Sequence, residues 1–382
     1  MGKISVVPIT VALILALTGC ASPVTPGSSG PSTMPPTMPS TMPSTTPATE
    51  LSSAPASRFD VTCAALVSSA ELAALFGANG YEPRLDWAPT VSPVKYAVQN
   101  IGGLSCTWGN DDAPVAGIAN PAYDELTVQV LPDATAAQIE LHVGDHPLDD
   151  AQPFGDSSGT TCFADSGLCT SNILVGAAWI DVFLQGANVT DSASGADVLA
   201  LASPVLSTIA ERVATAVASN ITPAVAAVAA RTDCEVVLPA ATVQSVFQSA
   251  ELPVHSTYNS GGWGVMTGAA TLAGVTRCIV GPAGSDASLA NLEMLPHGAW
   301  AFDLAQVRSG VWKTHEAVSV AGVTELAYLR CPVKTVSACA VDFIVGDDWL
   351  RLGTFINGQR PVEDADRDQV LELAGHVASA LK

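Results

Sequence analysis

The chain has few basic and few aromatic residues. Its 382 residues include 15 Lys and Arg against 36 Asp and Glu, which gives a formal net charge of -21, and aromatic residues make up 5%. A strongly acidic surface repels nucleic acid and anionic lipid headgroups, so this balance argues against both as partners. Hydrophobic residues make up 48% of the chain, which is enough to form buried cores.

No apolar run near the N-terminus is long enough to cross a membrane, which takes about 20 residues. The run VVPITVALILAL suits the core of a secretory signal instead, and it ends at Leu17-Thr18-Gly19-Cys20. A small-residue triplet that ends in Cys resembles the bacterial lipoprotein box, which implies cleavage before Cys20 and acylation of its thiol. We therefore interpret residues 1–19 as a lipoprotein signal peptide; an ordinary signal with a chance Cys nearby is the alternative.

Residues 20–57 are rich in Ser, Thr and Pro, repeat a T-M-P unit and carry almost no charge. Nothing in this segment could build a core, so the composition predicts an extended, disordered tether. At about 3 Å per residue it would span on the order of 100 Å. Its Ser and Thr residues are candidates for glycosylation, and a bare spacer is an equally good interpretation.

The remaining cysteines form two quartets with matching spacing. They are Cys63, Cys106, Cys162 and Cys169, followed by Cys234, Cys278, Cys331 and Cys339. Successive gaps are 43, 56 and 7 in the first quartet and 44, 53 and 8 in the second. Neighbouring phrases match as well: CTSNILVGAAW with CAVDFIVGDDW, and VQVLPDA with LEMLPHG. We interpret the chain as a tandem duplication, with repeat domains at 58–219 and 231–382 and a linker at 220–230.

Within each repeat the pattern predicts an α+β fold. A short helix follows the first Cys, with a capping box at Ser68 and Glu71 and a stop at Gly77 in the first repeat. Strands follow, and the two Cys-to-Trp phrases predict hairpins that turn at Gly176 and Gly346. Each repeat closes with an amphipathic helix, at 203–217 and 364–381. We expect an antiparallel sheet packed by the two helices of its repeat.

An even number of cysteines in an exported chain predicts disulfides, and four cysteines allow three pairings per repeat. We favour Cys162–Cys169 and Cys331–Cys339, because each pair brackets a short loop before a hairpin. Cys63–Cys106 and Cys234–Cys278 then remain. Metal ligation by the quartets is the alternative, but no CxxC spacing is present.

The lipoprotein box, the Thr/Pro tether, the Cys before a short helix, the Cys106-Thr107-Trp108 strand and the closing helix together resemble actinobacterial surface lipoproteins. The resemblance implies the PsbP-like α/β sandwich of the LpqN-like lipoproteins. The resemblance implies a fold and a location. Its motifs are structural, so it carries over no active site.

Two motifs suggest chemistry, and each has a structural explanation. Residues 155–159, GDSSG, fit the G-x-S-x-G nucleophile elbow with Ser157 as nucleophile, but DDAQP before them is no apolar strand. His142 and His146 lie near Asp145, Asp149 and Asp150, but Gly144 and Pro147 indicate a loop. We therefore expect no catalytic residue, no metal site and no cofactor.

The sequence predicts a non-enzymatic protein, lipid-anchored through Cys20 on the outer face of the cell membrane, that displays two binding domains. The expected partner is another envelope protein, a glycan or a lipid; no nucleic acid is expected. One alternative is a secreted serine hydrolase that uses Ser157 with one of the six His residues. Another is a structural or sensor-accessory envelope module.

Overall fold

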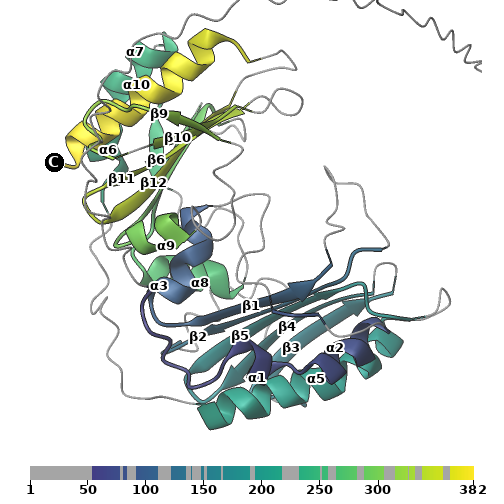
Figure 1. The fold of residues 1–382 in the computed structure, drawn as a ribbon. Coiled ribbons are helices and arrows are strands. Elements are labelled where there is room, and N and C mark those ends of the chain that lie inside the picture. The colour runs from purple at the N-terminus through teal and green to yellow at the C-terminus, as the bar shows by residue number, and fades with distance from the viewer. Residues whose placement is uncertain are drawn as a thin grey trace, which may run out of the picture. The chain divides into compact units, whose positions relative to one another are not determined.

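A computed structural model describes the fold (Figure 1). The residues that it describes are 54–77, 81–83, 92–110, 122–134, 139, 148–149, 153–164, 167–189, 194–216, 232–249, 252–256, 264–281, 288–304, 315–325, 327–331, 338–355 and 362–382. They all lie within residues 50–382, which form one compact unit. We refer to 58–219 as half 1 and to 231–382 as half 2.

Half 1 contains a five-stranded antiparallel sheet in the order β1-β2-β5-β4-β3. Its strands are β1 (Leu104–Gly109), β2 (Glu125–Leu131), β3 (Ser157–Phe163), β4 (Leu168–Val175) and β5 (Ala178–Gln185). The helices that the structure describes there are α1 (Cys63–Leu66), α2 (Ser69–Phe76), the 3-10 helix η1 (Pro93–Tyr96), α3 (Ala97–Asn100) and α5 (Gly195–Ala216).

Half 2 contains a seven-stranded antiparallel sheet in the order β6-β7-β8-β12-β11-β10-β9. Its strands are β6 (Val254–Ser256), β7 (Thr276–Val280), β8 (Ala290–Leu295), β9 (Glu316–Val318), β10 (Ala327–Arg330), β11 (Ala338–Val345) and β12 (Asp348–Phe355). Its helices are α6 (Cys234–Val237), α7 (Ala240–Phe247), α8 (Val265–Leu272), α9 (Ala299–Leu304) and α10 (Asp364–Ala380). The expected α+β class with antiparallel sheets is therefore confirmed.

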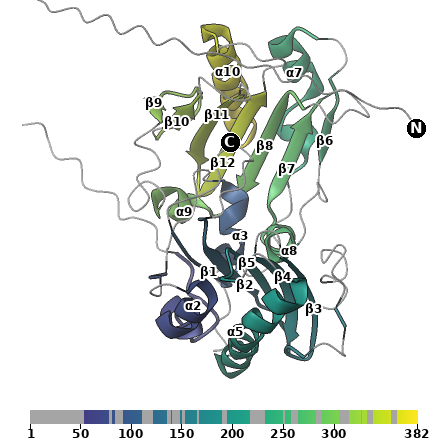
Figure 2. The ribbon, with the colours of Figure 1, turned by 90° about the vertical axis from the view of Figure 1, so that its right-hand side faces the viewer.

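The central five strands of half 2 follow the same order as the sheet of half 1. Strands β7, β8, β12, β11 and β10 hold the places of β1, β2, β5, β4 and β3. Among the described residues, half 2 also has the short strands β6 and β9 at the two edges of its sheet, and Figure 2 shows β6 beside β7. The residues after β2 and β8 also agree, since Asp133 and His297 both adopt positive φ, at 56° and 54°.

Several local predictions are confirmed. Helix α2 has the capping box of Ser68 and Glu71, and Gly77 ends it in the left-handed conformation with φ of 63°. The β4–β5 and β11–β12 hairpins turn where the sequence predicts, because Gly176 and Gly346 adopt positive φ at their tips. Glycine adopts positive φ without steric strain because it lacks a Cβ.

The closing helix of half 1 is longer than the sequence analysis expects, because α5 begins at Gly195 and runs through Pro204. The hydroxyl of Ser203 donates to the carbonyl of Leu199 at 2.6 Å, and that of Thr208 donates to the carbonyl of Pro204 at 2.9 Å. Residues Val198 and Ala202, ahead of the proline, are buried. Tertiary burial therefore offsets the cost of an internal proline.

Helices cover one face of each sheet. Figure 1 shows α5 along the sheet of half 1 and α7 with α10 along the sheet of half 2. Among the described helices, α5 is the one long and apolar enough to cross a membrane. Seven of its residues, from Val198 to Val213, are buried in the core of half 1, so its apolar face has a partner inside the protein.

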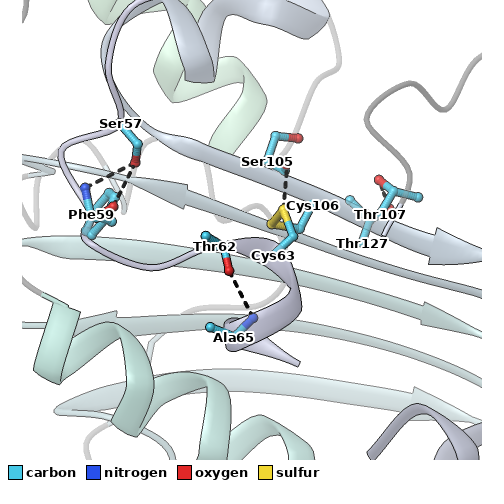
Figure 3. Close-up of a disulfide and its surroundings, with 9 residues drawn as sticks. All are labelled: Ser57, Phe59, Thr62, Cys63, Ala65, Ser105, Cys106, Thr107 and Thr127. Atoms are coloured by element: carbon cyan, nitrogen blue, oxygen red, sulfur yellow. Dashed lines mark hydrogen bonds between the residues drawn. A yellow bond between two sulfur atoms is a disulfide. The ribbon is translucent and has the colours of Figure 1, made fainter. Parts of the chain in front are cut away.

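Four cysteine pairs lie at disulfide geometry, and they are the pairs that the spacing favours. Cys63–Cys106 and Cys234–Cys278 have Cα–Cα distances of 5.5 and 5.6 Å. Cys162–Cys169 and Cys331–Cys339 have Cα–Cα distances of 4.1 and 4.2 Å. Figure 3 shows the Cys63–Cys106 bond between α1 and β1, beside the Thr62 cap of that helix. In both halves one bond joins the start of a helix to a strand, and the other joins two neighbouring strands near the loop between them.

A third hydrophobic cluster, which we call the joint cluster, contains residues from both halves. Half 1 contributes Val94, Tyr96, Ala97, Val98, Ile101, Leu131, Ala134, Ile139 and Trp179, and half 2 contributes Val265, Ala269, Ala270, Ala273, Val275, Leu295, Trp300, Ala301, Phe302, Tyr328, Ile344 and Trp349. Helix α3 packs against α8, and both views place them side by side (Figures 1 and 2).

The contacts of the joint cluster are reciprocal. Segment η1 of half 1 packs on β8 and β12 of half 2, while α8 of half 2 packs on β2 and β5 of half 1. The ring of Tyr96 lies 5.4 Å from that of Trp349, centroid to centroid. At the corresponding contact, a Cβ on Gly268 would come within 2.9 Å of Trp179. Each half thus covers the sheet of the other.

Candidate functional site

A row of charged side chains crosses the sheet of half 2. The β-sheet register places Arg277 beside Glu293, Glu293 beside Arg351, Arg351 beside Asp342 and Asp342 beside Tyr328. Opposite charges on directly paired residues attract, and like charges there repel. The alternation of sign along four strands is therefore favourable, and we call these five residues the ionic row.

The acidic members of the ionic row are the more buried ones. The side chain of Asp342 is fully buried and that of Glu293 is 10% exposed, against 20% for Arg351 and 33% for Arg277. Arg277 contacts Glu293 at 3.3 Å, and Arg351 lies 3.8 Å from Asp342 Oδ2. The pairing offsets part of the cost of burying these charges.

Asp342 is the most unusual member. Its Oδ1 accepts a hydrogen bond from Trp349 Nε1 at 3.1 Å, whereas its buried Oδ2 accepts none from the described residues. Burial raises the pKa of Asp342 to about 6, although the Arg351 charge and the Trp349 bond oppose that rise. A carboxyl group in this environment takes up a proton more readily than one in water.

Half 1 has a row at the same place in its sheet, with different chemistry. Its members are Ser105, Gln129, Asp181, Asn172 and Gly159, in the same strand order. Asn172 takes the place of Asp342 and accepts a hydrogen bond from Trp179 Nε1 at 3.0 Å. Asp181 takes the place of Arg351, and burial raises its pKa to about 6. We call this the polar row.

Each row meets the start of a helical segment from the other half. The backbone N–H of Val265, the first residue of α8, donates to Asp181 Oδ2 at 3.3 Å. The hydroxyl of Ser92, which precedes η1, donates to Glu293 Oε2. Lys95 of η1 is near the ionic row. Burial together with the Arg351 charge lowers the pKa of Lys95, although the charges of Glu125 and Glu293 act to raise it.

Asn100 adds a buried polar contact between the halves. Its side-chain amide donates to the carbonyl of Pro296 and its Oδ1 accepts from Trp300 Nε1, both at 2.9 Å. A buried amide that loses such partners costs roughly 1–3 kcal/mol. The rows and Asn100 therefore contribute polar contacts between the halves, and the raised pKa values of two row carboxyls favour proton uptake.

The structure places Ser157 at the start of β3, opposite Leu174. A nucleophile elbow needs a turn from a strand into a helix, and here a strand follows the serine instead. Asp156 accepts a hydrogen bond from the backbone N–H of Gly176 at 2.6 Å, so it supports the β4–β5 turn. Within GDSSG, Gly155 and Asp156 thus lie just before β3, and the last three residues form the start of that strand.

Other predicted sites fall outside the described residues. These are Cys20, the signal peptide, the tether, the linker and the cluster members His142, Asp145, His146 and Asp150. Asp149 is described, and its backbone pairs with that of Ser158. Within the described part of the chain, no group of three or more His, Cys, Asp or Glu is arranged to hold a metal ion.

An apolar pocket lies between α2, α5 and the sheet of half 1. It is lined by Leu75, Leu126, Cys169, Ser171, Val182, Leu184, Ala202, Val205 and Leu206. Its volume is about 10 Å³. A cavity of that size is at the lower limit for one water molecule, so it holds no lipid chain.

Sequence reasoning missed both rows. For the ionic row, the signal was present as a charged residue in the middle of an apolar strand, in TRCIV, NLEML, AVDFIV and WLRLG. Comparisons with protein-family models, with curated proteins and with solved structures found no match.

Proposed function

We propose that this chain is a lipid-anchored protein of a bacterial cell envelope, with a non-enzymatic binding body on a tether. The observation that carries the anchor is Leu17-Thr18-Gly19-Cys20 directly after an apolar run. The Ser/Thr/Pro segment that follows and the disulfide-rich body support export, because disulfides persist in oxidising compartments. Two or three acyl chains hold a protein on a membrane far better than one.

Expression of the wild type and of Cys20→Ala in a bacterium that processes lipoproteins tests the anchor. We expect the wild type to incorporate an alkyne-labelled fatty acid and to sediment with membranes, and the variant to lose both properties. Ser22→Ala, two residues further on, is the matched control and should behave as the wild type. Unchanged labelling and sedimentation of Cys20→Ala would refute the anchor.

We infer further that the two halves are copies of one ancestral unit. The shared strand order, the two matched pairs of disulfides and the Trp–Asn and Trp–Asp hydrogen bonds across equivalent hairpins support this. On this proposal the reciprocal joint evolved from a two-fold symmetric dimer of the ancestral unit. In such a dimer the same surface of each unit forms the contact.

The favoured binding partner is a protein or a glycan. The small volume of the α5 pocket gives no support to a lipid ligand at that place, and the charged groups of both rows face the joint. Native mass spectrometry of the chain purified from its host tests this. A glycan or lipid adduct names the ligand class, and an adduct-free mass favours a protein partner, to be identified by cross-linking in cells.

The hydrolase alternative predicts that Ser157→Ala abolishes hydrolysis of ester substrates. We expect no hydrolysis by either protein, because no described element gives Ser157 the geometry of an elbow. Activity of the wild type that disappears in Ser157→Ala would replace the binding proposal with the hydrolase. A structural or sensor-accessory role predicts no ligand and no activity.

A further inference from the structure

We propose that the contact between the two halves is an acid-strengthened joint, which Asp342 and Asp181 make firmer when they carry a proton. This goes beyond the proposed binding function and does not depend on the lipid anchor. It rests on the position of two carboxyl groups, one in each half, at the surface where the halves meet.

The burial of Asp342 depends on the joint. Its hydrogen-bond donor Trp349 belongs to the joint cluster, where the Tyr96 ring of the other half packs at 5.4 Å. Ile344, two residues after Asp342 on the same face of β11, belongs to the same cluster. When the halves separate, water therefore reaches this face of the sheet and can solvate an ionised Asp342.

Asp181 takes part in the joint directly. Its Oδ2 accepts from Val265 at the start of α8, and a Cβ on Gly264 would come within 2.2 Å of the same oxygen. The hydrogen bond from Val265 favours the ionised form, but burial outweighs it. The closed joint thus disfavours charge on both carboxyl groups, of which Asp342 is fully buried and Asp181 only partly buried.

The groups around each carboxyl are known for the described elements. Asp342 faces Arg351 on β12, Glu293 on β8 and Tyr328 on β10, and Lys95 of η1 lies close to Arg351. Arg351 lowers the pKa of Asp342 and Glu293 raises it. Asp181 faces the uncharged Asn172 on β4, Gln129 on β2 and the backbone of α8.

The direction of the effect follows from linkage. Both carboxyl groups have a pKa of about 6 in the closed structure, against a usual value of 3.8. Between these values the closed form binds more protons than the open form, so its stability falls as pH rises from about 4 to about 6. Acidification from about pH 6 to about pH 4 therefore stabilises the closed form. Above about pH 6 this proton-linked contribution to its stability is absent.

Hydrogen–deuterium exchange of the full chain at about pH 5 and about pH 7.5 tests this, with rates corrected for the intrinsic effect of pH. We expect amides of α8 and β8 to be protected about tenfold or more at the lower pH, since one pKa unit is a factor of ten. Amides of α5 and α10, which pack on the far faces of the sheets, should show a smaller pH effect.

Variants make the test specific. Asp342→Asn introduces the residue that half 1 has at this place, Asn172, and Asp181→Asn removes the other carboxyl. The pair of substitutions should abolish the pH dependence at α8 and β8, and each alone should reduce it. Asp368→Asn, at an exposed carboxylate of α10, is the matched control and should leave it intact.

A pH dependence that survives in the double variant would overturn the proposal, as would weaker protection of α8 at the lower pH. If the double variant fails to fold, the single variants and the wild-type profile still decide the question.

Discussion

Trp349 and Asp342 are seven residues apart and lie diagonally across the β11–β12 hairpin, where the indole N–H donates to the carboxylate at 3.1 Å. Trp179 and Asn172 repeat this contact in half 1, at 3.0 Å and the same spacing. Both tryptophans are fully buried. The two contacts differ mainly in the charge of the acceptor, so they form a matched pair for experiment.

Trp349→Phe should therefore destabilise the protein more than Trp179→Phe. Both changes remove an indole from a tight core, but only the first deprives a buried carboxyl of its donor, with an extra cost of about 1–3 kcal/mol. Urea unfolding near neutral pH measures both. Equal losses in the two variants would mean that the carboxyl finds another donor.

The long disulfides should matter more than the short ones. Cys234–Cys278 closes a loop with a sequence separation of 44 and Cys331–Cys339 one of 8. The chain-entropy relation predicts a loss of about 4 kcal/mol for the first bond and about 2.5 kcal/mol for the second. Replacement of each pair by Ala and unfolding under oxidising conditions checks the order. A larger loss for the short bond would contradict it.

The position of Gly268 has no room for a side chain. A Cβ there would lie 2.9 Å from Trp179 Cζ3 and 3.4 Å from a Leu131 methyl group. Ala normally favours a helix over Gly by about 1 kcal/mol, but we expect Gly268→Ala to destabilise by roughly 1–3 kcal/mol through crowding. Thr271→Ala on the same helix is the control, and the melting temperature is the measurement. A higher melting temperature for Gly268→Ala would contradict the reciprocal packing.

We expect the contribution of Glu71 to stability to change with pH in the opposite direction to that of Asp342. Burial alone would raise the pKa of Glu71, but hydrogen bonds from Arg212 and Ser68 outweigh it and hold the pKa below the usual 4.5. Its contribution is therefore present above pH 4.5 and is lost as pH falls through the folded pKa.

Glu71→Gln should cost about 1 kcal/mol near neutral pH, because a capping box with Gln keeps its geometry but loses the charge. The difference from the wild type should vanish in acid, as measured by urea unfolding across that range. Glu211→Gln, at an exposed neighbour of Arg212, is the control. A difference that is constant with pH would exclude a role for the Glu71 charge.

Much of each half could be predicted from the sequence, because the signals are local. The cap of α2 at Ser68, the turn at Gly176 and the disulfide Cys162–Cys169 each depend on residues close together in the chain. The start of α5 was not predictable in the same way, since Pro204 indicates a break and the burial of Val198 overrides it.

The signal peptide, the anchor at Cys20 and the tether are sequence predictions, and they lie outside the described residues. The proposed repeat was likewise inferred from the sequence, through its cysteine spacing. These inferences depend on composition and order along the chain, which the sequence contains in full.

The joint depended on tertiary structure. Arg277, Glu293, Arg351 and Asp342 come from four strands, and only the register of the sheet makes them neighbours. A shift of one residue in any strand would turn its charge to the other face. The sequence by itself determined the local signals, which are the helix cap at Ser68, the hairpin turns and the favoured cysteine pairs, and it carries the spacing behind the proposed duplication. Tertiary packing decided which carboxyl groups are buried, because burial depends on which half covers which sheet.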